Sequence, residues 1–225
     1  NFPKRGNNAK AYRRSYVAPP GYVVLEADLS QAELRISADM AQDRVMLKVY
    51  NEGGDIHSTT AATTLNVPGA VFAQWGQDKR KLIDCANEIA GSGDFLRKLN
   101  PGQRKEATVK DYYKAKRQEA KAINFGFIYG MGWRKFVGYA KTQYGVEFTD
   151  AEAEAIRNAY FKKYGALTGW HERTRAYAKT HKQVRSYSGR IRHLPMIDSD
   201  DDAIQSEASR QAINSPVQEF GSSLG

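Results

Sequence analysis

The chain of 225 residues is 41% hydrophobic and 26% charged and has a formal net charge of +9, a composition typical of a soluble globular protein. This composition excludes wholesale disorder, and the longest uninterrupted aliphatic stretch, Val23-Val24-Leu25, is far too short to cross a membrane. The single cysteine, Cys85, excludes an internal disulfide and a cysteine-based zinc site and favours a reducing compartment, which we take to be the cytoplasm.

The first half of the chain predicts one strand and several helices. Residues 21–28 are mainly apolar after a turn and predict a buried strand. One helix is predicted from Ser30 to about Tyr50 and another from Lys110 to about Ile128, where Tyr129-Gly130 ends it. Between these helices, Gly and Pro residues divide positions 58–110 into short helical pieces.

The second half predicts three helices and a hairpin. Thr149 and Glu152 have the spacing of a capping box at the start of a helix that reaches Tyr164. A second helix is predicted over 167–182 and a last one over 202–213, which Pro216 interrupts or kinks. Two short strands flank Ser188-Gly189 and predict a hairpin with a two-residue turn. Because helices dominate and a few strands accompany them, the predicted fold class is α+β.

The positive charge is concentrated in two segments. Residues 79–121 hold twelve basic and six acidic side chains, and residues 157–192 hold ten basic and one acidic. Such segments indicate a polyanionic partner, with solvated helix faces as the alternative. Aromatic residues are interleaved with the basic ones, which favours nucleic acid over a membrane surface because bases stack on aromatic rings.

The sequence Asp28-Leu29-Ser30-Gln31-Ala32-Glu33-Leu34-Arg35 follows directly on the predicted strand. A carboxylate at the end of a strand is well placed to bind a hard cation such as Mg²⁺. The alternative is purely local: Asp28 is an acid before a helix, and Ser30 with Glu33 forms a capping box.

A second pattern places Arg117, Lys121, Phe125 and Tyr129 at intervals of four residues, followed by Gly130. On a helix this spacing aligns the side chains along one face. Two cations suit a polyphosphate and two aromatic rings suit a flat base. Aromatic residues at this spacing are also common in cores, which is the alternative for Phe125 and Tyr129 taken singly.

These two patterns resemble motifs A and B of the family A DNA polymerases, of the bacterial DNA polymerase I type, and we expect a phage-like member. Further matches follow in the family's order and extend over nearly the whole chain: Asn1-Phe2-Pro3-Lys4-Arg5, Gly54-Asp55-Ile56-His57, Ser188-Gly189-Arg190 and Arg210-Gln211-Ala212-Ile213-Asn214-Ser215-Pro216-Val217-Gln218. The resemblance implies a DNA-directed DNA polymerase that adds deoxynucleotides to a primer on a DNA template. It also implies a right-hand polymerase fold, here the mainly helical fingers with part of an antiparallel-sheet palm.

The resemblance assigns the catalytic roles. Asp28 is similar to the carboxylate that binds two Mg²⁺ ions, with the Leu29 carbonyl as a further metal ligand. Lys121 would protonate the leaving pyrophosphate.

The remaining assignments concern the two substrates. Arg117 and His57 would hold the triphosphate together with Lys121. The other residues expected in the nucleotide pocket are Phe125 against the incoming nucleotide, Tyr129 near the templating position, Glu33 as the steric gate against a ribose 2′-hydroxyl, and Gln31. Primer–template DNA would be contacted by Arg5, Arg210, Asn214 and Gln218.

The resemblance also predicts a domain division. Residues 1–35 would be a palm segment with motif A, 36–204 the fingers and 205–225 a return to the palm. The fingers would contain the motif B helix over 112–130. They would also contain an insertion at about 62–110, either an additional template contact or a solvated excursion.

Some features depart from the family pattern. Leu29 and Ala32 replace the usual Tyr and Ile of motif A. No His-Asp-Glu motif C follows, so we expect the chain to need a further palm portion, on the same or a second polypeptide, and to be inactive alone. The alternatives to a DNA polymerase are a non-catalytic nucleic-acid-binding module and a single-subunit RNA polymerase. Glu33 and Phe125 favour deoxynucleotides, because an RNA enzyme must admit the 2′-hydroxyl.

Overall fold

A computed structural model describes residues 11, 14–25 and 29–224, in two compact units, Asn1–Gln31 and Ala32–Gly225. In the first unit the predicted strand is absent over the described residues 21–25, and the side chains of Val23 and Leu25 are 81% and 90% exposed. A strand needs a neighbouring strand to pair its backbone groups, and the described residues of this unit contain none. Residues 26–28, and Asp28 with them, lie outside the described residues.

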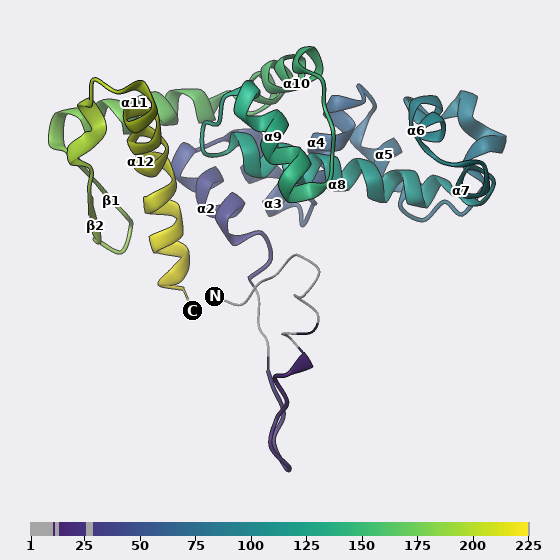
Figure 1. The fold of residues 1–225 in the computed structure, drawn as a ribbon, viewed down its shortest axis with the longest axis horizontal. Helices are drawn as coiled ribbons and strands as arrows, with labels where there is room; N and C mark the ends of the chain where they lie inside the picture. The colour runs from purple at the N-terminus through teal and green to yellow at the C-terminus, as the bar shows by residue number, and fades with distance from the viewer. Residues whose placement is uncertain (1–10, 12–13, 26–28, 225) are drawn as a thin grey trace. The chain divides into compact units, whose positions relative to one another are not determined.

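The second unit is mainly helical with one small antiparallel sheet, which confirms the helix-dominated α+β fold class (Figure 1). Its elements are α2 (Ala32–Ala41), α3 (Arg44–Asn51), α4 (Ile56–Thr64), α5 (Gly69–Trp75), η1 (Leu82–Glu88), α6 (Ser92–Lys98), α7 (Pro101–Glu106), α8 (Val109–Phe127), α9 (Trp133–Tyr144), α10 (Asp150–Lys163), α11 (Ala166–His181), β1 (Gln183–Arg185), β2 (Ile191–His193), η2 (Pro195–Asp198) and α12 (Asp202–Ser222). The division into palm and fingers stays a prediction.

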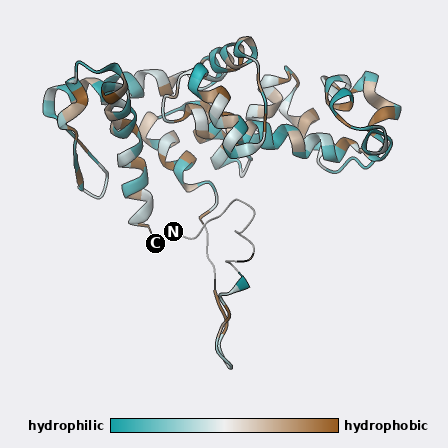
Figure 2. Ribbon diagram, viewed as in Figure 1, coloured by the Kyte–Doolittle hydropathy of each residue, from teal (hydrophilic) through white to brown (hydrophobic). Residues whose placement is uncertain are grey.

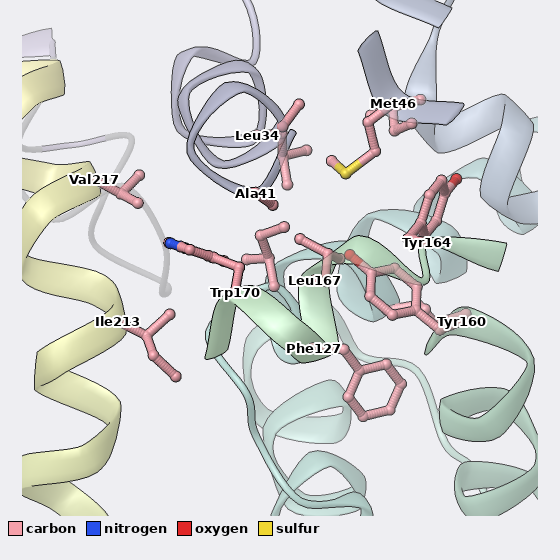
Figure 3. Packing of buried hydrophobic residues seen from close by; sticks show 14 of the residues in the cluster. Leu34, Ala41, Met46, Phe127, Tyr160, Tyr164, Leu167, Trp170, Ile213 and Val217 are labelled. Atoms are coloured by element: carbon pink, nitrogen blue, oxygen red, sulfur yellow. The ribbon is translucent and has the colours of Figure 1, made fainter. Parts of the chain in front are cut away.

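A large hydrophobic core joins α2, α3, α4 and the helices from α8 to α12. Leu34, Phe127, Leu167 and Ile213 are fully buried in it, and Tyr160 is almost so. Figure 3 shows these side chains converging from α2, α8, α10, α11 and α12 on one interior. The helices carry hydrophilic and hydrophobic residues side by side (Figure 2), as expected for helices that cover a core.

A second core occupies the stretch predicted as an insertion. Phe72 and Trp75 of α5, Leu82 of η1 and Leu96 of α6 pack with Tyr112 of α8. The Tyr112 hydroxyl donates a 2.7 Å hydrogen bond to the Ala90 carbonyl, which fixes the turn before α6. The short helices of this stretch therefore fold around their own apolar interior, and its role stays a prediction.

The hairpin is confirmed, but its turn is longer than predicted. Strand β1 pairs antiparallel with β2 from Gln183 opposite His193 to Arg185 opposite Ile191. Ser186 N–H then donates to the Arg190 carbonyl at 3.0 Å, and Gly189 has φ +84°. A left-handed glycine at this position closes a three-residue loop rather than a two-residue turn.

Three helix predictions need correction. The helix predicted over 30–50 is two helices, because Gln42 has φ +54° and Asp43 starts α3 as its N-cap. Helix α9 was not predicted at all, although Gly145 at φ +68° ends it in the usual way. Helix α12 does not end at 213 but continues through Pro216 to Ser222.

The Asp43 side chain caps two helices at once. Its carboxylate accepts hydrogen bonds from the backbone N–H groups of Val45 and Met46 at 3.1 and 3.0 Å. It also accepts one from the N–H of Ala166, the first residue of α11, at 3.1 Å. Asp43 is only 2% exposed, so water competes little with these hydrogen bonds.

No helix in the described part of the chain is long and apolar enough to cross a membrane.

Replacing Asp43 with Ala should lower the free energy of unfolding by about 2–3 kcal/mol, because three buried or partly buried amides lose their acceptor. Asp201→Ala is the matched control: Asp201 caps only α12, by bonds to Ala203 and Ile204, and its loss should cost about 1 kcal/mol. Denaturant titration of both variants measures the difference. Equal losses would mean that the bond to Ala166 contributes nothing.

Candidate functional site

Helix α8 carries the row of residues that the sequence pattern singled out. It begins at a capping box of Thr108 and Asp111 and ends at Phe127. Arg117, Lys121 and Phe125 are each partly exposed along it, at intervals of one turn. Tyr129 lies beyond the helix, after the C-cap residue Ile128, so the predicted helix over 112–130 is about right in position but too long at its end.

Arg117 is bound to Asp55 of the loop before α4. Its Nε and Nη2 atoms donate to the two carboxylate oxygens at 2.7 and 3.0 Å, a bidentate pair. Asp55 is also the N-cap of α4 and accepts from the N–H and hydroxyl of Ser58 at 3.0 and 2.7 Å. The start of α4 is thereby joined to the middle of α8.

Asp55 is strongly biased toward its ionised form. Burial alone would raise the pKa of its carboxyl, but hydrogen bonds from Arg117 and Ser58 outweigh burial and hold the pKa at about 2. The same pairing raises the pKa of Arg117. The ion pair is therefore fully charged at neutral pH.

His57 lies one residue into α4 and is 2% exposed. Its Nδ1 accepts a 3.0 Å hydrogen bond from the Asn124 amide of α8, and its ring lies 6.0 Å from that of Phe125. Burial, with smaller effects of the Arg117 and Lys121 charges, lowers the pKa of His57 to about 4. The imidazole is therefore neutral at pH 7.

Asn124 connects His57 to a buried polar network. Its Oδ1 accepts a 3.0 Å hydrogen bond from Thr60 Oγ1, which lies 2.8 Å from the hydroxyl of Tyr164, the C-cap residue of α10. Asn124 also donates to the Ala120 carbonyl at 2.9 Å. Four side chains from α4, α8 and the C-terminal cap of α10 thus satisfy one another inside the core, which fixes His57 in one orientation.

A second cluster surrounds Tyr129. Its hydroxyl donates a 2.7 Å hydrogen bond to Oε2 of Glu33, in the first turn of α2, and accepts one of 3.3 Å from Gln218 of α12. Burial, followed by the charge of Glu33, raises the pKa of the Tyr129 phenol, so Tyr129 keeps the proton that it donates.

The other residues expected to contact DNA, nucleotide or metal belong to neither of these two clusters. Arg210 of α12 is bonded to Ser206 at 2.9 Å and pairs with Glu207. One turn further, the side-chain oxygen of Asn214 is buried and has no hydrogen-bond partner within the described part of the chain. Leu29 and Gln31 belong to the first unit, where Leu29 is 54% exposed and Gln31 has φ +56°. Arg5 and Asp28 lie outside the described residues.

The described residues do not form a complete metal site. Among them no group of three or more His, Cys, Asp or Glu side chains could hold an ion. The metal-binding roles of Asp28 and Leu29 stay predictions.

Sequence reasoning assigned no role to Asp55 or Asn124. Asp55 follows Gly53-Gly54 and precedes a helix, a recognisable N-cap signal, but nothing in the sequence joins it to Arg117, 62 residues away. Asn124 stands among the apolar residues Ala122, Ile123 and Phe127, and a polar residue in such a stretch is the available signal.

Comparison with known proteins gives a consistent result. The family model described as DNA polymerase family A matches residues 1–85 and 101–223. The unmatched residues 86–100 fall inside the predicted insertion. DNA polymerase I of Pseudomonas aeruginosa is 37% identical over 218 residues, which are 97% of this chain and 19% of that protein. DNA polymerase I of Aquifex aeolicus is 28% identical, over 99% of this chain and 30% of its own length.

A solved structure shares the fold. It is the POL domain of Pol1 from M. smegmatis in complex with DNA primer-template and dNTP, with a TM-score of 0.65 and 23% identity. The alignment covers 97% of this chain and 30% of that one. The chain thus spans about a fifth to a third of the length of the curated relatives named here.

Replacing Asp55 with Asn should cost about 2 kcal/mol of stability at pH 7, since Asn can still cap α4 but cannot pair as an anion with Arg117. Because the folded pKa of Asp55 lies below its ordinary value of 3.8, this stabilisation is present above pH 4 and lost as pH falls toward 2. Denaturant titrations at pH 7 and at pH 2–4 measure it. A gap between wild type and variant that persisted at pH 2 would contradict the assignment.

Proposed function

The chain belongs to the family A DNA polymerases, and on that basis we propose that it is the nucleotide-binding part of a DNA-directed DNA polymerase. Its substrates would be a deoxynucleoside triphosphate and primer–template DNA. The observation that carries this proposal is the row of Arg117, Lys121 and Phe125 on α8, which leads to Tyr129 and its bond to Glu33.

The two cations of the row would act differently. Arg117 already shares two of its donor groups with Asp55, so a triphosphate would find it oriented but largely neutralised. Lys121 has no ion pair or hydrogen bond with the described residues, and its charge is the uncompensated one. Lys121 is thus the better candidate to stabilise and protonate the leaving pyrophosphate.

His57 would bind through a hydrogen bond and not through charge. A neutral, buried ring whose Nδ1 accepts from Asn124 carries its proton on Nε2. It can offer that single donor to a phosphate oxygen. Phe125, beside it, would present a flat apolar surface to the nucleotide.

The Tyr129–Glu33 pair accounts for the proposed choice of sugar. The Tyr129 hydroxyl holds the Glu33 carboxylate at 2.7 Å, which limits the positions that the carboxylate can take. A carboxylate held over C2′ leaves no room for a hydroxyl group there. Gln218, bonded to the same tyrosine, and the other α12 residues Arg210 and Asn214 would contact the DNA near this point.

Further parts of the function stay proposals. Two Mg²⁺ ions, held by Asp28 and the Leu29 carbonyl, would activate the primer 3′ oxygen and stabilise the leaving group. A further palm portion would complete the site, and a cytoplasmic location is expected.

In the complete polymerase, Lys121→Ala should slow nucleotide incorporation by about 10²–10⁴-fold, the usual loss when a positioned acid is removed. Lys114→Ala is the matched control: Lys114 lies on the same helix, 63% exposed, and should change the rate little. Single-turnover primer extension separates the two. An effect of Lys121→Ala on dNTP affinity alone would assign it to phosphate binding instead of proton transfer.

Glu33→Ala should admit ribonucleotides, because the volume that excludes the 2′-hydroxyl is removed. We expect the ratio of rNTP to dNTP incorporation to rise by at least about tenfold, at some cost in stability from the lost Tyr129 bond. Competition between rNTP and dNTP in wild type and variant measures the ratio. If only stability changed, Glu33 would be a helix-terminal residue without a role in selection.

A further inference from the structure

The turn that follows α8 is held by a histidine of α11, a helix that is distant in the sequence. His171 of α11 donates from Nε2 to the carbonyl of Ile128 at 2.8 Å, across 43 residues of sequence. Ile128 is the C-cap of α8, where a helix leaves its carbonyl groups without partners. His171 is 3% exposed, so water does not compete for the bond.

The donor can be assigned. A carbonyl only accepts, so Nε2 of His171 must carry a hydrogen. Burial lowers the pKa of His171 to about 4 in spite of the bond to Ile128, and the ring is neutral at pH 7 with a single N–H. That N–H donates to the Ile128 carbonyl in the turn.

The next residues of the turn are fixed by close packing. Gly130 has φ +75°, and a Cβ added there would lie 2.5 Å from Nη2 of Arg175, 3.3 Å from Cδ1 of Ile213 and 3.5 Å from Nδ1 of His171. Its N–H donates to the Phe127 carbonyl at 2.9 Å. The turn is thus in contact with α11 and α12 and has little room for another arrangement.

Tyr129 lies between these two fixed points. Its side chain carries the 2.7 Å bond to Glu33. A shift of the Ile128 carbonyl would move the Tyr129 backbone, and the Glu33 carboxylate would follow or lose its donor. The hydrogen bonds of the described residues join His171 to Ile128 and Tyr129 to Glu33, so an effect of His171 on Glu33 would pass through the turn.

We propose that His171 is a positioning residue: by holding the Ile128 carbonyl it fixes the turn that carries Tyr129, and through Tyr129 the carboxylate of Glu33 that selects the sugar. This inference rests on the proposed polymerase function. It adds a residue of α11 to the determinants of nucleotide selection.

Two variants separate the hydrogen bond from packing. His171→Phe keeps an aromatic ring between Phe161 and Trp170, whose ring centroids lie 5.9 and 5.2 Å from that of His171, but has no donor. His171→Gln offers an amide N–H at about the reach of Nε2. His181→Phe is the matched control, because His181 lies on the same helix, is exposed and, among the described residues, contacts Tyr177 of its own turn through a hydrogen bond to the carbonyl and ring stacking.

In the complete polymerase, His171→Phe should raise the ratio of rNTP to dNTP incorporation by about 3- to 10-fold, the change that corresponds to one lost hydrogen bond. His171→Gln should return the ratio to within about twofold of wild type, and His181→Phe should leave it unchanged. A lower melting temperature in His171→Phe with an unchanged ratio would overturn the proposal, because His171 would then only stabilise the fold.

A second readout needs no polymerase activity. In the 225-residue chain, hydrogen–deuterium exchange of residues 128–131 should accelerate by about 3- to 10-fold in His171→Phe and not in His171→Gln or His181→Phe. Absence of primer extension by the complete polymerase, wild type included, would count against the proposed function, while exchange in the 225-residue chain would still test the turn. Unchanged exchange in His171→Phe would overturn the positioning role.

Discussion

One helix belongs to two hydrophobic cores, and the candidate site depends on this constraint. The N-terminal half of α8 places Tyr112 in the core of the predicted insertion, and its C-terminal half places Ile123 and Phe127 in the main core. Neither half can rotate about the helix axis without exposing one of these sets. The direction in which Arg117 and Lys121 project is therefore decided by apolar residues on the other faces of the same helix.

Polar bonds then fix the side chains of Arg117 and His57, whose positions the apolar cores do not determine. Asp55 ties the start of α4 to Arg117, and the network of Asn124, Thr60 and Tyr164 holds His57 against α8. Each of these groups is satisfied by a side chain from another helix. The Arg117 guanidinium and the His57 imidazole thus keep fixed relative positions before any substrate is present, as the proposed phosphate site would require.

The parts of the fold that local signals determine could be predicted from sequence, and those set by distant partners could not. Capping boxes and periodicity gave α8, α10 and α11 to within a few residues. The break at Gln42 depends on Asp43, whose third partner is far away in the sequence. The regular spacing of the α8 row gave the candidate site in outline. By contrast, the roles assigned to Asp28 and Glu33 came from family resemblance, and the pairings of Asp55 and His171 required the folded arrangement.

The double cap of Asp43 sets an order in time. Its carboxylate and the Ala166 amide are 123 residues apart, so the bond cannot form until the ribosome has synthesised both. At roughly 5–20 residues per second this interval is roughly 6–25 s. During it, α3 has a cap that is satisfied on one side only, and the carboxylate keeps its hydration. Release of that water, and closure of the core beside α3, must wait for α11, so this part of the core is completed only after about three quarters of the chain has been synthesised.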